Sequence, residues 1–256
     1  MTQNERLHFL LRYLLVERKE YEDIPVPDTL PEKRRLLRSL MNVRPPIPVS
    51  EEFLYVQDAY LKERLAERGV TSIKDLTPMR PGQYLWQGDI TTLAVDAIVN
   101  AANSQMLGCF VPCHGCIDNA IHTYAGVQLR LECARLMAGQ EEDEPAGGAK
   151  ITKAYNLPCR YVLHTVGPVI YGAVTQANRD LLVSCYRTCL ELAAENGLGS
   201  VAFCCISTGE FRFPNELAAE IAVQTVREWQ QQNPDKIKVI FNVFKDSDDA
   251  IYKRLL

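Results

Sequence analysis

From residue 82 to the end of the chain, short apolar runs alternate with longer segments in which apolar residues recur every three or four positions. The short runs predict strands, and the longer amphipathic segments predict helices. The predicted strands span residues 83–86, 97–100, 161–165, 201–206 and 238–243. The predicted helices span residues 118–137, 178–195, 215–231 and 247–255. This alternation is typical of an α/β fold in which helices cover a central sheet.

The N-terminal part of the chain shows helical spacing instead of alternation. Leucines from Leu7 to Leu15 form one apolar stripe, and a shorter stripe runs from Leu36 to Met41. Apolar residues at this spacing predict helices that each bury one face.

Capping residues mark where these helices begin. Thr2 and Thr29 are each followed three residues later by a glutamate, which is the capping-box pattern. A third helix is predicted over residues 51–68, because Ser50 can cap its start and Gly69 can end it.

The change of pattern predicts two regions, an N-terminal helical extension over residues 1–80 and an α/β domain over residues 81–256. Three short amphipathic helices cannot easily bury their stripes alone, so we expect them to pack on the larger domain. Two interpretations of the extension stay open. It is either a structural appendage, or it shapes the substrate entrance and recognises a protein partner.

Composition and charge agree with a soluble enzyme. Of the 256 residues, 47% are hydrophobic and 23% are charged, which is enough to bury a large core. The formal net charge of −4 offers no basic field for nucleic acid. Nine cysteines, an odd number, together with the lack of a signal region or a membrane-spanning run, indicate a cytoplasmic protein with no membrane contact.

The densest group of metal-binding side chains lies between residues 108 and 122. Cys109, His114 and Cys116 provide two thiols and an imidazole within eight residues. These are the ligand types that Zn²⁺ prefers, and a site with three protein ligands leaves a fourth position for water or substrate. Cys113 is a fourth candidate, but adjacent residues cannot easily both turn toward one ion. The alternative is that the thiols are ordinary buried side chains.

The segment just before this loop points to a ligand site. Residues 95–99 form a short apolar run that continues into Asn100 and Asn103. In open α/β sheets, ligands bind beyond the carboxyl ends of the strands. We therefore expect the amide groups of these asparagines to emerge at such a site.

Six sequence motifs in one order resemble the successive signatures of the macrodomain family. They are Gly-Asp-Ile at 88–90, VDAIVNAAN at 95–103, IDNAIH at 117–122, GAKIT at 148–152, HTVGP at 164–168 and STGEFRFP at 207–214. The resemblance covers residues 82–256. Most enzymes of the family have a run of glycines where this chain has the longer segment CFVPCHGC, which resembles the zinc-containing branch.

The resemblance implies a three-layer α/β/α fold with a mixed sheet, preceded by the helical extension. It also implies an ADP-ribose site, to which Asp89 and Ile90 contribute and in which Asp89 accepts a hydrogen bond from the adenine amino group. The loop from Ser207 to Phe211 holds the diphosphate, and Phe211 lies near the distal ribose. That loop contributes Ser207, Thr208, Gly209, Glu210 and Phe211. Arg212 departs from the small residue usual in the family at that position.

The resemblance further implies hydrolysis of mono-ADP-ribose from a protein side chain, with a carboxylate as the acceptor. Asn103 and Asp118 match the residues that hydrolytic macrodomains place around the distal ribose. Zn²⁺ is the implied cofactor, and a lipoyl-carrier-type protein modified by a companion sirtuin is the implied substrate. Two alternatives stay open: a module that binds ADP-ribose without turnover, and hydrolysis of a small ester such as O-acetyl-ADP-ribose.

Overall fold

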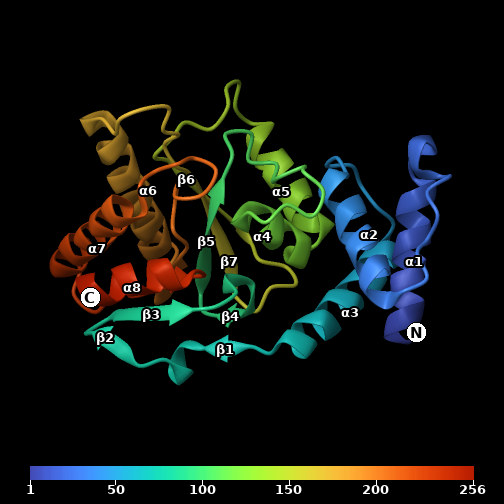
Figure 1. The fold of residues 1–256 in the computed structure, drawn as a ribbon, viewed down its shortest axis with the longest axis horizontal. Coiled ribbons are helices and arrows are strands. Elements are labelled where there is room, and N and C mark those ends of the chain that lie inside the picture. The colour runs from blue at the N-terminus through green and yellow to red at the C-terminus, as the bar shows by residue number, and fades with distance from the viewer.

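The computed structural model describes the whole chain, from Met1 to Leu256. Helices near the N-terminus form one side of the molecule, and a sheet flanked by helices forms the rest (Figure 1). None of the helices combines the length and the apolar character that crossing a bilayer requires.

The extension contains the three predicted α-helices. They are α1 (Gln3–Val16), α2 (Leu30–Val43) and α3 (Glu51–Arg68), with a 3-10 helix η1 (Lys19–Tyr21) after α1. Their apolar stripes pack on one another in a cluster of 13 buried residues that also includes Val127 from the larger region. The helices therefore bury their stripes mainly against each other.

The predicted capping residues begin and end these helices, although Thr29 does not complete its predicted capping box, because the Glu32 carboxylate accepts from the Thr29 hydroxyl instead of its N–H. Thr2 accepts the N–H of Glu5 and the Glu5 carboxylate accepts the N–H of Thr2, which completes a capping box. The Thr29 hydroxyl caps α2, and Ser50 caps α3 by accepting the N–H of Phe53. Gly69 ends α3 with a φ of 80°, a conformation that glycine adopts without strain.

A mixed sheet of seven strands lies at the centre, in the order β2-β3-β9-β8-β5-β7-β6. The strands are β2 (Pro78–Arg80), β3 (Gln83–Gln87), β5 (Ala97–Ala102), β6 (Ala149–Lys153), β7 (Tyr161–Val166), β8 (Ser200–Phe203) and β9 (Lys238–Val243). The inner strands are parallel, and the two edge strands β2 and β6 are antiparallel to their neighbours. The predicted α/β fold with a mixed sheet is confirmed.

Two further short strands, β1 (Thr71–Ser72) and β4 (Leu93–Ala94), pair in parallel outside this sheet. The 3-10 helices η2 (Ile73–Asp75) and η3 (Ile90–Thr92) lie beside them in sequence. Strands β1 and β2 precede residue 81 but pair with strands that follow it. The domain boundary at residues 80 and 81 stays a prediction.

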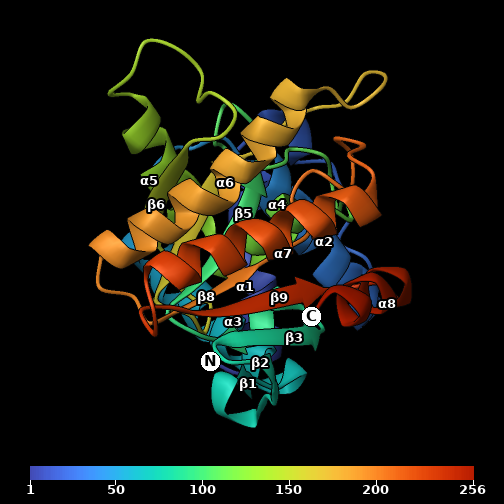
Figure 2. The same cartoon turned by 90° about the vertical axis from the view of Figure 1, so that its left-hand side faces the viewer.

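Helices cover both faces of the sheet. Helices α6 (Gln176–Glu195), α7 (Asn215–Gln232) and α8 (Asp246–Leu255) lie on one side, where α6 and α7 cross in front of the strands (Figure 2). Helices α4 (Ile117–Ala125) and α5 (Val127–Met137) lie on the other side, between the sheet and the extension (Figure 1). A cluster of 41 buried residues fills the space between the layers.

Several elements differ from the sequence-based prediction, which also did not include the short strands β1, β2 and β4. The helix predicted over residues 118–137 is two helices, because Gly126 adopts a φ of 96° and breaks it. Strand β6 was not predicted, because Lys150 and Lys153 leave no continuous apolar run in this short segment. Strand β8 ends at Phe203 instead of residue 206, because the chain turns there into the loop that precedes α7.

Candidate active site

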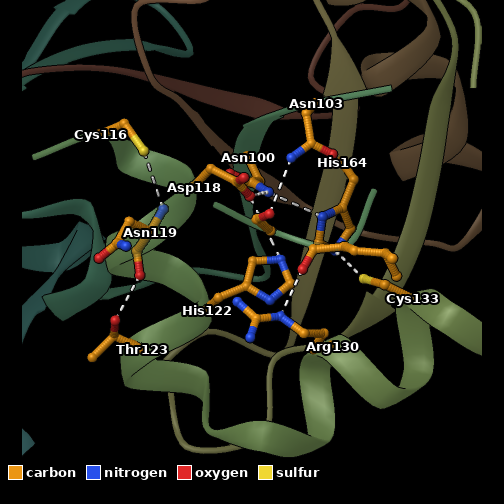
Figure 3. A network of polar contacts seen from close by, with 12 residues as sticks. Asn100, Asn103, Cys116, Asp118, Asn119, His122, Thr123, Arg130, Cys133 and His164 are labelled. Atoms are coloured by element: carbon orange, nitrogen blue, oxygen red, sulfur yellow. Dashed lines mark hydrogen bonds and ion pairs between the residues drawn. The ribbon is translucent and has the colours of Figure 1, made fainter. Parts of the chain in front are cut away.

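The carboxyl ends of β5 and β7 place a buried polar group against the start of α4. Asn100, near the end of β5, is fully buried and donates a hydrogen bond of 2.8 Å from Nδ2 to Oδ1 of Asp118 (Figure 3). The same Nδ2 lies 3.2 Å from Nδ1 of His164, which is the partner of Asn100 in the register of β5 and β7. The strand pairing thus fixes the position of the Asp118 carboxylate.

Asp118 lies in the first turn of α4 with only 5% of its surface exposed. Burial raises the pKa of its carboxyl to about 6, although the hydrogen bond from Asn100 and the positive charge of Arg130 both oppose that shift. Asp118 is therefore a carboxyl group whose protonation can change close to neutral pH. A positioned acid or base in a hydrolytic site needs this property.

Asn103 lies one residue beyond β5. Its Nδ2 donates a hydrogen bond of 3.0 Å to the carbonyl of Gly108. This bond anchors the amide group to the start of the cysteine-rich loop, which spans residues 108–116. Its Oδ1 is buried and has no partner within the protein. Buried polar atoms are rarely left unpaired, so this oxygen is suited to accept a hydrogen bond from a bound ligand.

His122 lies one helical turn after Asp118 and is 5% exposed. The sequence predicts a packed, hydrogen-bonded core histidine, with a base as the alternative, and the structure confirms only the packing. Its Nε2 lies 3.5 Å from Oδ1 of Asp118, and neither ring nitrogen has a hydrogen-bond partner. Burial lowers the pKa of His122 well below its usual value, so the ring is neutral beside the carboxyl.

The structure brings the three predicted metal ligands together. The ligand atoms of Cys109, His114 and Cys116 all lie within 4.8 Å of one another, and Sγ of Cys109 is 3.7 Å from Nδ1 of His114. Cys116 is also the residue that caps α4, where its sulfur accepts the N–H of Asn119 at 3.4 Å. Two thiols and an imidazole converging in this way fit a zinc ion with an open fourth position.

Cys113 points away from this group. Its thiol donates to the carbonyl of Arg35 in α2 at 3.4 Å, and its N–H donates to Oδ1 of Asn42 at 2.9 Å. Its backbone has a φ of 53°, which turns the loop between Cys109 and His114. The structure therefore separates the fourth cysteine from the other three ligands.

The extension holds the cysteine-rich loop from outside. Arg38 of α2 donates to the carbonyl of His114 at 2.9 Å and to Oδ1 of Asn119 at 2.7 Å. Asn42 of α2 is almost fully buried and donates to the hydroxyl of Thr123 in α4. These contacts fix the loop and the first turns of α4 relative to α2.

The buried side chain of Arg130 connects α5 with the end of α2 and with the cysteine-rich loop. Its guanidinium is 5% exposed and donates to the carbonyl of Leu107 at 2.6 Å, just before the loop. It also caps the end of α2, where it donates to the carbonyls of Met41, Asn42 and Arg44. The ring of Phe110 lies 4.3 Å from the guanidinium carbon, so the loop packs against the same charge.

The predicted adenine residues lie at the end of β3, in contact with the extension. Oδ1 of Asp89 accepts the N–H of Thr91 at 3.0 Å, and Oδ2 accepts from Arg68 at 2.9 Å. Arg68 ends α3, and its guanidinium carbon lies 3.6 Å from the centre of the Tyr124 ring. Ile90 is buried beside them at 1% exposure. Asp89 is therefore a half-exposed acceptor that an extension arginine orients.

The loop from residue 207 to 211 presents free backbone donors. The N–H groups of Gly209, Glu210 and Phe211 make no hydrogen bond within the protein, whereas the N–H groups of Thr208 and Arg212 close turns. A Cβ on Gly209 would meet nothing within 4 Å, so its surroundings are open. Consecutive free N–H groups of this kind suit a phosphate.

The floor of this loop is closely packed. Ser207 adopts a φ of 64° and is 6% exposed, and a Cβ on Gly167 would lie only 2.0 Å from its hydroxyl oxygen. Phe213 is fully buried in the core, while Phe211 is half-buried and its carbonyl accepts the N–H of Ile170. Glycine at 167 is therefore required for the close approach of the two loops.

The loop of residues 207–211 and the cysteine-rich loop are in contact. Oε1 of Glu210 lies 3.4 Å from Nε2 of His114. The predicted diphosphate site and the predicted metal site are thus neighbours. Asn103 contacts the start of the cysteine-rich loop, and Asp118 follows its end in the first turn of α4. Asp89 and Ile90 lie apart from these residues, after the end of β3.

Three side chains at this site were not predicted as functional residues. They are Asn42, Arg38 and Arg130. The sequence carries no signal for them, because polar and charged residues on a helix surface are ordinary. Asn100 was expected to present its amide at the ligand site, but it is fully buried and contacts Asp118 and His164.

Comparisons with known proteins agree on one protein family. The Macro domain family model matches residues 99–222. A protein-ADP-ribose hydrolase of Treponema medium is 56% identical over 260 residues, covering 100% of both chains. A protein-ADP-ribose hydrolase of Staphylococcus aureus is 50% identical over 254 residues, covering 98% of this chain and 95% of the other.

A solved structure agrees with these sequence matches. The Trypanosoma brucei macrodomain in complex with ADP-ribose has a TM-score of 0.65 and 33% identity to this chain. The match covers 85% of this chain and 94% of that one, so it includes part of the extension.

Proposed function

The chain belongs to the Macro domain family and is a protein-ADP-ribose hydrolase, and we propose that its activity depends on zinc held by Cys109, His114 and Cys116. The observation that carries this proposal is the convergence of those ligand atoms within 4.8 Å while Cys113 turns away. Cysteine and histidine ligands with a fourth position open are typical of catalytic zinc.

The proposed ADP-ribose site runs along the carboxyl ends of the parallel strands. Asp89 accepts a hydrogen bond from the adenine amino group, and Ile90 lies beside it. The free N–H groups from Gly209 to Phe211 hold the diphosphate, and Ser207 and Thr208 shape the loop that presents them. The distal ribose then lies between Asn103, Asp118 and the cysteine-rich loop. Support for this placement comes from Glu210, which joins the two loops at His114.

The proposed reaction breaks the bond between C1″ of the distal ribose and an oxygen of the modified side chain. Water adds its oxygen to C1″, the departing oxygen keeps the bonding electron pair, and one proton of the water is released. Charge develops on the sugar in such reactions. The products are ADP-ribose and the free carboxyl group of the protein.

The chain's own residues orient the reacting groups. Asn100 fixes the Asp118 carboxylate, which then orients a ribose hydroxyl or the attacking water. The unpaired Oδ1 of Asn103 accepts a hydrogen bond from the same sugar. A bound zinc ion would supply a Lewis acid beside these groups, lowering the pKa of water or polarising a ribose hydroxyl.

We propose a carboxylate ester as the linkage, and a lipoyl-carrier-type protein modified by a sirtuin as the substrate, on the basis of the cysteine-rich segment. The relatives of 50–56% identity are named as hydrolases, which favours turnover over binding alone.

Metal removal tests the zinc proposal. Purified protein is incubated with a mono-ADP-ribosylated protein, before and after dialysis against a strong chelator. We expect the metal-free protein to lose most of its turnover, since a metal-activated group then disappears from the site. Zinc should restore the rate and magnesium should not, because the ligands are thiolates and imidazole. Full activity in protein shown by elemental analysis to lack metal would contradict the proposal.

A substitution at the adenine end tests the binding model. Asp89→Ala should weaken ADP-ribose binding by about 1 to 3 kcal/mol, the usual cost of losing a hydrogen bond to a charged group. Isothermal titration calorimetry measures the change. Asp89→Asn, which keeps an oxygen acceptor for Arg68 and adenine, is the matched control and should lose less. Unchanged affinity of Asp89→Ala would remove Asp89 from the site.

A further inference from the structure

A cavity of about 370 Å³ lies between α2, α3 and α4, on the side of α4 that faces the extension. Four arginines line it: Arg34, Arg35 and Arg38 from α2, and Arg64 from α3. The remaining wall is mostly apolar and no acidic side chain lines it. Such a concentration of positive charge is unexpected in a protein with a formal net charge of −4.

The arginines of this cavity are only partly neutralised. Arg34 and Arg64 share one carboxylate, that of Glu67. Arg38 donates only to neutral oxygens, those of Asn119 and His114. The exposed guanidinium of Arg35 has neither an ion pair nor a hydrogen bond with the protein. Four positive charges therefore face one negative charge.

The cavity adjoins the site of the proposed reaction. Cys113 forms part of its wall and is adjacent in sequence to His114. Arg38 links the cavity to the carbonyl of His114 at 2.9 Å. Tyr124 lines the cavity on one side and stacks with Arg68, the partner of Asp89, on another. The cysteine-rich loop therefore presents Cys113 to the cavity and its other three metal-binding side chains to the proposed site.

We propose that this arginine cavity binds an acidic segment of the ADP-ribosylated protein substrate. The inference rests on the proposed function, since it assigns a protein partner to that same site. Arginines pair well with carboxylates, and complementary charge at an interface raises the rate of encounter and fixes orientation. The wall also contains the half-buried ring of Tyr124, an apolar surface that suits a peptide chain better than a free inorganic anion.

The test compares two synthetic peptides, each carrying mono-ADP-ribose on one side chain. One peptide has Asp and Glu around the modified residue, and the other has Asn and Gln in their place. The enzyme carries Asp118→Ala, so that binding is measured without turnover and independently of the hydrolytic proposal. Binding is measured by fluorescence anisotropy at low and at high salt.

Arg35→Glu should weaken binding of the acidic peptide by about threefold to tenfold, the scale of losing and reversing an exposed charge contact. High salt should reduce the difference, because exposed charges are screened. The neutral peptide should bind Arg35→Glu and the parent equally. Glu67→Gln should bind the acidic peptide more tightly, since it removes the one competing carboxylate, and Arg35→Lys should retain most of the affinity.

Arg187→Glu is the matched control, because Arg187 is an exposed arginine on α6 on the opposite face of the sheet. Equal weakening by Arg187→Glu and Arg35→Glu would overturn the proposal, because net charge alone would then explain the effect. Equal affinity of the two peptides for the parent would also overturn it. If inorganic phosphate competes through Arg35 while the peptides do not discriminate, the cavity is a small-anion site and the proposal is wrong.

Discussion

Asp118→Ala should reduce release of ADP-ribose from a modified protein by on the order of 10²-fold or more, the scale expected for losing a positioned acid or base. ADP-ribose affinity should fall much less, because the adenine and diphosphate contacts lie elsewhere. The carboxylate is held by Asn100 at 2.8 Å and is 5% exposed, so the variant removes one oriented group and little else. Single-turnover release measures the rate, and calorimetry measures the affinity.

Asp118→Asn is the control that separates charge from shape. It keeps the size of the side chain and can still accept the hydrogen bond from Asn100. If charge is what matters, Asp118→Asn should be nearly as slow as Asp118→Ala while its thermal stability stays close to that of the wild type. An undiminished rate in Asp118→Ala would keep the hydrolase and assign the chemistry to the metal site.

Substitution of the proposed metal ligands should remove both zinc and activity. Purified protein should contain about one zinc per chain, and Cys109→Ala, His114→Ala and Cys116→Ala should each lose most of it together with the activity, because three ligands is the fewest that catalytic zinc sites use. Elemental analysis measures the zinc, and competition with a chromophoric chelator measures the affinity that remains.

Cys113→Ser is the internal control for this series. Its thiol hydrogen-bonds to the carbonyl of Arg35 and lies outside the ligand group, and a serine hydroxyl can replace that bond. Zinc content and activity should therefore stay near the wild-type values. Equal zinc loss in Cys113→Ser would show that the ligand assignment is wrong, and absence of zinc from the wild type would remove the metal from the mechanism.

Much of the fold could be predicted from local patterns. The caps Thr2, Ser50 and Gly69 act within one helical turn, so the sequence contains all the information that places them. The inner strands β5, β7, β8 and β9 are buried on both faces and read as apolar runs. Strand β6 is an edge strand that contains two lysines, and its position depends on pairing with β7, which no local pattern reports.

Part of the candidate site could also be predicted from local spacing, and part of it depends on long-range packing. Cys109, His114 and Cys116 lie within eight residues, and their spacing alone indicated that they could meet. Arg38 contacts Asn119 across 81 residues of sequence, and Arg130 contacts Met41 across 89. Such contacts follow from how the extension packs on α4 and α5. A single sequence gives no measure of that packing.

The hydrogen bonds of the Arg130 guanidinium affect how the protein unfolds. Three of the four carbonyls that it binds, those of Met41, Asn42 and Arg44, come from the extension, and the fourth, that of Leu107, precedes the cysteine-rich loop. Without the extension, the guanidinium would lose three of these four acceptors, and the contact between α5 and the end of α2 would be lost with them. The two regions are therefore expected to melt in a single cooperative transition. Proteolytic removal of the first three helices should not release an independently stable catalytic half.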